Sequence, residues 1–260
     1  MLLVVIGFLV GTIGTLIGVG GGFILIPILL FLFPGHDNVW ISAMSMWVVS
    51  LNSTSGSIAY LRRGTVHLRA AFAFILASLP GSVLGVWIER FINRQQFETV
   101  FGTAMLLYAL AIFFRQAKQH VESNLTPKSK LSFDFYLKGC LISFGVGFIA
   151  SFLGIGGGVV HVPLLSQVLG FPVHLATGTS HSILAVTAWF ATAVHIYNGD
   201  LNLHESMVWE LGLSAVAGAQ LGAYLSKKVS APMILRILAV ALFFVGLRLV
   251  WPGVGRLLIQ

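Results

Sequence analysis

Long apolar segments follow one another along almost the whole of this chain. They lie at residues 1–17, 39–61, 70–92, 98–115, 134–153, 174–197, 204–226 and 231–250. A helix that crosses the roughly 30 Å hydrocarbon core of a bilayer needs about 20 mostly apolar residues. Only 9% of the residues are charged, whereas a soluble domain has about 25%. The pattern predicts one all-α, polytopic membrane domain that covers residues 1–260.

The positive charge of the chain is explained by a membrane rather than by a nucleic acid. The formal net charge is +7, and the basic residues gather in short loops at segment ends, as the positive-inside bias of membrane proteins predicts. We therefore expect a lipid bilayer as surroundings and no nucleic-acid partner. The single cysteine, Cys140, excludes an internal disulfide and a multi-cysteine metal site. The sequence predicts neither a metal nor a cofactor.

A glycine motif that occurs twice divides the chain into two similar halves. The run GVGGGFILIP at residues 18–27 recurs as GIGGGVVHVP at residues 154–163, an offset of 136 residues. Further residues agree at nearly the same offset: Ser45 with Ser180, Gly64 with Gly199, and Gly81 and Gly85 with Gly218 and Gly222. This pattern predicts two repeats of five segments each, about 1–115 and 134–260, joined by the polar linker 116–133.

A short apolar piece follows each glycine motif, at residues 22–33 and 158–169. Each piece spans only about half of a 30 Å core, which predicts glycine-broken half-helices near mid-bilayer. One continuous helix over residues 1–33 would be about 50 Å long, so a hairpin that turns at the glycines is favoured. With such hairpins the second repeat is inverted relative to the first, and parallel repeats are the alternative. The inverted arrangement places three basic loops on one side, the cytoplasm: 62–69, 115–138 and 227–236.

The two glycine clusters are the first candidate for a binding site. They are Gly20, Gly21 and Gly22 in the first repeat, and Gly156, Gly157 and Gly158 in the second. Exposed backbone at membrane depth must be buried in protein or line a polar cavity, and the N-terminus of the helix after each cluster favours an anion. Paired interrupted helices mark the substrate site in many transporters. Isolated pairs such as Gly81 and Gly85 are interpreted as packing contacts.

Polar side chains inside the segment 174–197 form a second candidate. They are Thr177, Thr179, Ser180 and His181, and the matching segment of the first repeat offers Ser45 and Asn52. Hydroxyls and a neutral imidazole can bind an oxyanion by hydrogen bonds without a permanent buried charge, and hydrogen bonds between helices are the alternative for each hydroxyl. An ionisable residue inside a membrane span is by default a functional hypothesis. We assign this role to His181 and interpret His161 and His195 as core residues.

Acidic residues are missing from the interiors of the predicted spans. Glu89, Asp134 and Glu205 lie near segment ends, and Glu210 lies about one turn inside. Cation transporters and carboxylate proton relays place acids at mid-membrane. The sequence therefore favours an anionic or neutral substrate.

These residues resemble the sulfite exporter TauE/SafE family. The resemblance rests on the doubled glycine motif with Pro27 and Pro163, on Ala176 to His181, and on Gly199 after the next apolar run. It covers essentially the whole chain. It implies a bacterial inner-membrane permease for small sulfur-containing anions, such as sulfite, sulfoacetate and related organosulfur compounds.

Together these patterns predict a secondary transporter that exports a small anion by alternating access. An anion channel with the same glycine and hydroxyl site is the alternative. An intramembrane enzyme would need a nucleophile and base, or a metal constellation, and the sequence offers no acid partner for His181. Proton coupling and a homodimer are both compatible with the sequence.

Overall fold

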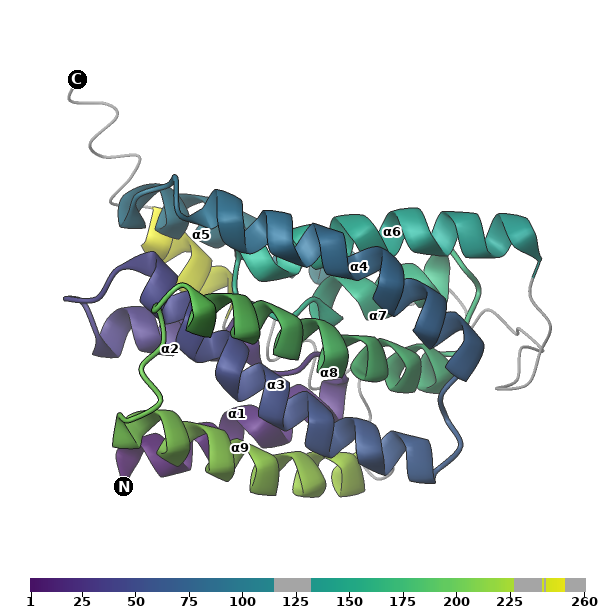
Figure 1. Ribbon diagram of the computed structural model, residues 1–260, viewed down its shortest axis with the longest axis horizontal. Helices are drawn as coiled ribbons and strands as arrows, with labels where there is room; N and C mark the ends of the chain where they lie inside the picture. The colour runs from purple at the N-terminus through teal and green to yellow at the C-terminus, as the bar shows by residue number, and fades with distance from the viewer. Residues whose placement is uncertain (115–131, 227–239, 241, 251–260) are drawn as a thin grey trace.

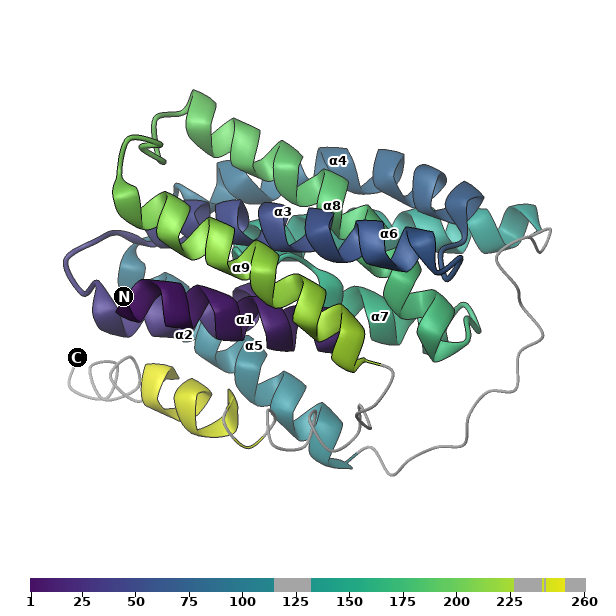
Figure 2. The same ribbon diagram turned by 90° about the horizontal axis from the view of Figure 1, so that it is seen from below.

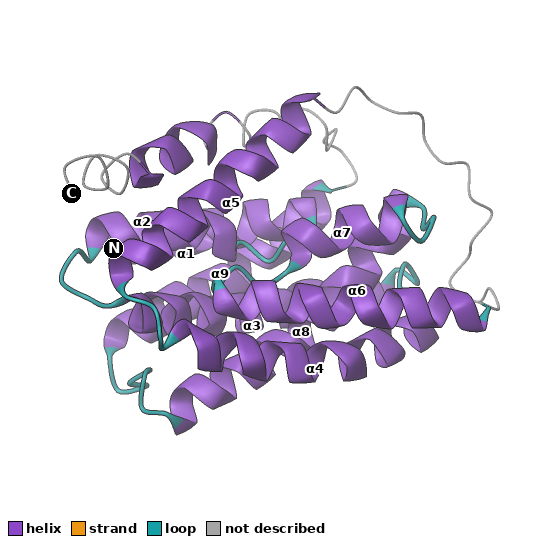
Figure 3. Ribbon diagram, turned by 90° about the horizontal axis from the view of Figure 1, so that it is seen from above, coloured by secondary structure: helices purple, strands orange, loops and turns teal. Residues whose placement is uncertain are grey.

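The computed structural model describes residues 1–114, 132–226, 240 and 242–250, and these are helical with short connections and no strand among them (Figure 3). The bounded helices are α1 (Leu2–Ile17), α2 (Gly22–Leu32), α3 (Asn38–Arg62), α4 (Leu68–Glu89), α5 (Arg94–Phe114), α6 (Phe133–Phe152), α7 (Gly158–Gln167), α8 (Val173–Tyr197) and α9 (Ser206–Leu225). The expected all-α class agrees with this. Most of the predicted linker 116–133 lies outside the described residues.

Many polar side chains are buried inside this bundle, and many large apolar side chains are exposed on its outside. Ser45 and Asn52 on α3 and Thr179 on α8 are fully buried, whereas Phe72 and Leu141 on α4 and α6 are exposed. A water-soluble protein rarely exposes such extensive apolar surface. Among the described helices, α4 and α6 are long and apolar enough by themselves to cross a membrane. Helices α3 and α8 are longer, at 25 residues each, but their buried hydroxyls reduce their hydropathy.

Three helix pairs form the body of the molecule. Helices α3 and α8 pack together at the centre, α4 packs on α6, and α1 packs on α9. Figure 1 shows these pairs one above another, with α4 and α6 at the top and α1 and α9 at the bottom. Figure 2, from below, shows α1 and α9 side by side. The central pair also contacts both outer pairs, through α3 on α9 and α4 on α8.

Small residues allow the two outer pairs to pack with their backbones close together. A Cβ at Gly81 or Gly85 of α4 would collide with the backbone of Phe144 or Phe148 on α6. On the other side of the bundle, a Cβ at Gly218 of α9 would meet the backbone of α1. The packing interpretation of these glycines is therefore confirmed. Such close approach is how membrane helices commonly associate, because lipid provides no hydrophobic force between them.

The chain turns back sharply at each glycine cluster. Gly21 and Gly157, which precede α2 and α7, have φ angles of 84° and 70°, a left-handed conformation that favours glycine. After the first turn Gly21 lies beside Val10 of α1, and after the second Gly157 lies beside Val146 of α6. Helices α1 with α2, and α6 with α7, are therefore hairpins that turn at the glycines, and α2 and α7 begin inside the bundle.

Candidate functional site

The two glycine clusters meet at the centre of the bundle. A Cβ built on Gly22 would lie 2.8 Å from the carbonyl oxygen of Ile155, and one built on Gly158 would lie 2.6 Å from the Cα atom of Val19. The first residue of each short helix therefore touches the turn of the other cluster. No side chain larger than hydrogen fits at either position without displacing backbone.

Two apolar side chains close the space beside this contact. Gly20 and Gly156 both lie against Val49 of α3 and Leu184 of α8. These two side chains are buried and lie 135 residues apart in the sequence. The clusters are therefore packed against each other and against hydrocarbon side chains, and the volume for a ligand must lie to one side of them.

Predicted polar residues of α3 hold the turns in place. The Ser45 hydroxyl donates a hydrogen bond to the carbonyl oxygen of Gly154, at 2.7 Å. The Asn52 side-chain amide donates to the carbonyl oxygen of Gly20 at 3.0 Å and accepts from the hydroxyl of Thr15, also at 3.0 Å. Because a buried carbonyl without a partner is costly, these bonds stabilise the unusual backbone. They leave Ser45 and Asn52 in contact with the glycine turns.

The polar group predicted on α8 is divided between two environments. The Thr179 hydroxyl accepts a hydrogen bond from the backbone N–H of His67, at 3.0 Å. The Ser180 hydroxyl and both ring nitrogens of His181 are buried without a hydrogen-bond partner. The His181 ring packs edge-on against Tyr60, with centroids 5.5 Å apart, and touches the backbone side of α3 at Gly56. The His181 ring is therefore buried against the ring of Tyr60.

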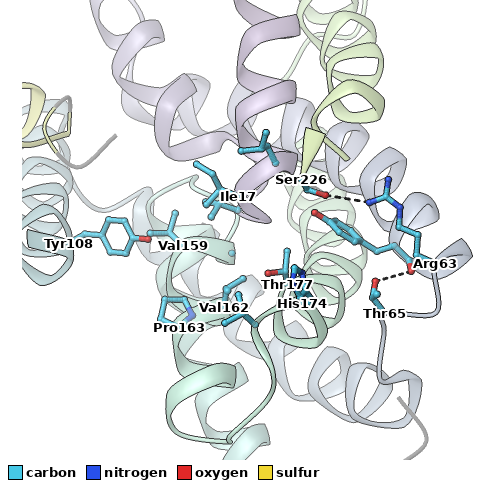
Figure 4. Close-up of a pocket in the computed structure, with 15 residues that line it drawn as sticks. Ile17, Arg63, Thr65, Tyr108, Val159, Val162, Pro163, His174, Thr177 and Ser226 are labelled. Atoms are coloured by element: carbon cyan, nitrogen blue, oxygen red, sulfur yellow. Dashed lines mark hydrogen bonds between the residues drawn. The ribbon is translucent and has the colours of Figure 1, made fainter. Parts of the chain in front are cut away.

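A cavity of about 220 Å³ lies beside the glycine contact, at the end of the bundle where α3 ends and α8 begins. Figure 4 shows Ile17, Val159, Val162 and Pro163 on its apolar side. It extends inward to Gly158 at the start of α7. Of the twelve residues predicted for the site, Gly158 and Thr177 line this cavity. The other ten lie outside its lining.

Arg63 lies on the polar side of the cavity. From the sequence alone, this residue was expected only in a basic loop and not in the site. Arg63 follows α3 directly, and its guanidinium donates a hydrogen bond to the Ser226 hydroxyl at 3.3 Å, as Figure 4 shows. The same guanidinium lies 6.0 Å from the ring centroid of Tyr60. The Tyr60 hydroxyl in turn donates to the carbonyl oxygen of Thr15, at 2.9 Å, which fixes the ring against α1.

This arrangement suits a small anion. No Asp or Glu is among the residues that line the cavity, whereas Arg63, His174, Thr65 and Thr177 are. A guanidinium presents planar, paired donors that match an oxyanion. Sequence reasoning missed this pair; the i, i+3 spacing of Tyr60 and Arg63, which places both on one helix face, is the signal that could have found it.

The opposite end of the bundle is held by an ionic group around Asp200. Its carboxylate accepts from the guanidinium of Arg90 and lies 3.0 Å from Nδ1 of His195. Partial burial acts to raise the pKa of Asp200, but the hydrogen bonds and charges of His195 and Arg90 outweigh it and lower that pKa below its usual value. Asp200 is therefore ionised at neutral pH and ties the loop after α8 to the end of α4.

Comparison with known proteins places the chain in one family. Residues 3–249 match the model of the sulfite exporter TauE/SafE family. The probable membrane transporter protein YunE of Bacillus subtilis is 28% identical over 98% of both chains. The probable membrane transporter protein MJ0441 of Methanocaldococcus jannaschii is 29% identical over 91% of this chain and 90% of that protein. No solved structure matches the chain significantly. This chain belongs to the sulfite exporter TauE/SafE family of membrane transporters.

Proposed function

We propose that this transporter carries a small anion, sulfite or a small organosulfur anion such as a sulfonate, outward across the cell inner membrane. The observation that carries the proposal is the placement of Arg63 in a cavity without acidic residues that reaches Gly158 at the start of α7. A single guanidinium with neighbouring hydroxyls matches a small oxyanion in both charge and geometry. Family membership supports a sulfur oxyanion as the first substrate to test.

The directions of the helices support the inverted-repeat arrangement. Tyr60 packs on His181, and Trp47 packs on Trp189, so the equivalent helices α3 and α8 run antiparallel. The residues after α3 and those after α8 then lie at opposite ends of the bundle. Arg62, Arg63 and Arg69 share the end that holds the cavity, so the positive-inside bias makes this end cytoplasmic. The cavity is then open to the side from which an exporter takes its substrate.

A closed glycine contact favours a carrier over a channel. The cavity lining ends at Val19 and Gly158, where the two clusters touch and where Val49 and Leu184 fill the adjoining space. A carrier exposes its site to one side at a time, whereas an open channel needs a continuous polar path. In this proposal α2 and α7 are half-helices whose glycine turns separate the two sides, and the buried residues Ser45, Asn52 and Thr179 support that barrier.

Transport of sulfite by the purified full-length protein tests this function. Liposomes loaded with radiolabelled sulfite should lose it at a rate that saturates with internal sulfite concentration, and external unlabelled sulfite should accelerate the exchange. Saturable, exchange-stimulated flux identifies a carrier. Flux that rises linearly with concentration and carries a large electrical current would instead identify an anion channel. The absence of any sulfite, sulfonate or thiosulfate flux would contradict the proposed function.

Labelling of two equivalent residues tests the inverted arrangement. Arg62 and Tyr197 are the last residues of α3 and α8, and both are exposed. In a Cys140→Ala background, the single variants Arg62→Cys and Tyr197→Cys should react with a membrane-impermeant thiol reagent from opposite sides of intact cells or oriented vesicles. Parallel repeats would give reaction from the same side. Detergent-solubilised protein, in which both thiols are accessible, provides the control for reactivity.

A further inference from the structure

The end of the bundle opposite the cavity holds a group of polar side chains that the proposed transport site does not use. They come from the start of α3, the ends of α4 and α8, and the loop after α8. They are Asn38, Ser42, Glu89, His195 and Asp200. The first four are at most 3% exposed, and the side chain of Asp200 is 12% exposed. Buried polar groups are costly unless they are hydrogen-bonded or paired.

The repeat relates this group to the open cavity, residue by residue. The offset is 135 residues between α3 and α8 and 137 between α4 and α9. Five residues that line the cavity are Tyr60, Thr65, Val173, Thr177 and Ser226. Their counterparts, in the same order, are His195, Asp200, Asn38, Ser42 and Glu89. The buried group therefore occupies the place that a second cavity would have if the opposite end were open.

Glu89 is the residue of this group whose protonation state is expected to differ most between the closed and the open arrangement of this end. Its side chain is fully buried, although the sequence places it at a span end. Both carboxyl oxygens lack a hydrogen-bond partner, whereas the backbone carbonyl accepts from the Asn38 amide and from the backbone N–H of Ile92, each at 3.3 Å. The Ser42 hydroxyl faces the carboxyl group and interacts with it, but it makes no well-formed hydrogen bond to either carboxyl oxygen.

On balance the charged groups around Glu89 disfavour an ionised carboxylate. Arg90, the next residue, favours the ionised form but donates its hydrogen bond to Asp200, and His195 is also paired with Asp200. Asp37, the N-cap residue of α3, and Asp200 add negative charge close to the carboxyl group. Helix α6 faces this part of α4 with Ser151 and Phe152, which do not titrate.

Burial then determines the protonation state. An isolated carboxylate inside protein is so unfavourable that the group takes up a proton instead. Glu89 is also the last residue of α4, where the partial negative charge of the helix end disfavours a second negative charge. In the closed arrangement of this end, Glu89 is therefore a neutral carboxylic acid.

We propose that Glu89 is a proton-binding site that must be occupied before the end of the bundle opposite the cavity can close. The proposal rests on the alternating access described above. When that end opens, water reaches the carboxyl group, and the proton leaves Glu89 for water while the carboxylate is hydrated. Closure requires the reverse step, in which one proton from the water on that side binds the carboxylate. Acid on that side alone then favours closure, and base favours opening.

The labelling rate of a cysteine introduced at a buried position of this end measures, without any substrate, how readily the end opens. Leu153, 3% exposed, is the counterpart of the cavity residue Ile17 and should become accessible when this end opens. In right-side-out vesicles with the Cys140→Ala background, the labelling rate of Leu153→Cys is compared with that of the exposed Tyr197→Cys, which corrects for thiol ionisation. With external pH varied alone, the ratio should rise by up to about tenfold per pH unit while Glu89 titrates.

Variants of Glu89 test whether its carboxyl group causes the pH dependence of the labelling rate. Glu89→Gln, which mimics the neutral acid permanently, should give slow labelling of Leu153→Cys with no pH dependence. Glu89→Asp, which can still titrate, should restore that dependence. Glu205→Gln removes a half-buried acid from the same end and should behave as the parent protein. An unchanged pH dependence in Glu89→Gln would overturn the proposal.

Infrared spectroscopy of the otherwise unmodified protein tests the same site independently of labelling. The closed state should show the carbonyl stretching band of a dry, protonated carboxylic acid, and Glu89→Gln or Glu89→Asp should remove or shift it. The absence of this band from the wild-type protein would overturn the proposal even if a variant failed to insert. Because neither measurement uses an anion, failure of sulfite transport would contradict the proposed substrate without affecting this result.

Discussion

Gly158→Ala is expected to reduce sulfite transport more than about tenfold while the protein remains inserted in the membrane. The added Cβ would lie 2.6 Å from the Cα atom of Val19 and 2.8 Å from the carbonyl oxygen of Gly18. Overpacking of this kind costs about 1–3 kcal/mol, and 1.4 kcal/mol corresponds to a factor of ten. Gly158 has no left-handed φ, so the effect would arise from the contact between the clusters rather than from local strain.

Two further alanine variants make this expectation specific. Gly22→Ala changes the matching glycine of the first glycine motif, where the Cβ would meet Ile155, and it should impair transport to a similar degree. Gly145→Ala provides the matched control, because it lies within α6 and no atom approaches its Cβ position within 4 Å. It should transport normally. If all three variants transport at the rate of the parent protein, the contact between the clusters is not part of the transport cycle.

Local sequence patterns predicted the helices closely because each depends on nearby residues. The predicted span 174–197 differs from α8, Val173–Tyr197, by one residue, and the predicted short piece at 22–33 corresponds to α2, Gly22–Leu32. Apolar length and glycine runs fix these boundaries through backbone hydrogen bonding and hydropathy alone. The same reasoning predicted the turn at each glycine cluster.

The site was less predictable because its members are assembled by long-range packing. Arg63 looks like an ordinary loop cation in the sequence, and only the approach of Ser226, 163 residues later, places it in the cavity wall. Glu89 looks like an acid at a span end, yet the Arg90 and Asp200 pair folds the loop after α8 over that end. Hydropathy carries no information about either contact.

Arg63→Ala is expected to weaken sulfite binding at least about 100-fold. The variant removes the only Arg or Lys side chain that lines the cavity among the described residues. A hydrogen bond to a charged group contributes about 1.5–3 kcal/mol, and a guanidinium can offer two of them to one oxyanion. Arg63→Lys keeps the charge without the paired donors and should recover part of the affinity. Equilibrium binding of radiolabelled sulfite to the purified protein measures both effects.

The neighbouring arginine and the buried histidine separate the role of Arg63 from simpler explanations. Arg62→Ala removes an equal charge one residue earlier from an exposed position outside the cavity, so it should change the affinity for sulfite little. A loss equal to that of Arg63→Ala would mean that general surface charge attracts the anion.

His181 supports the ring of Tyr60, over which Arg63 lies. His181→Ala should therefore weaken binding by no more than about tenfold, because it removes only the edge-on ring contact that holds Tyr60, worth about 0.5–1.5 kcal/mol. If His181→Ala instead exceeds Arg63→Ala, the anion binds beside the histidine and the cavity is only its entrance.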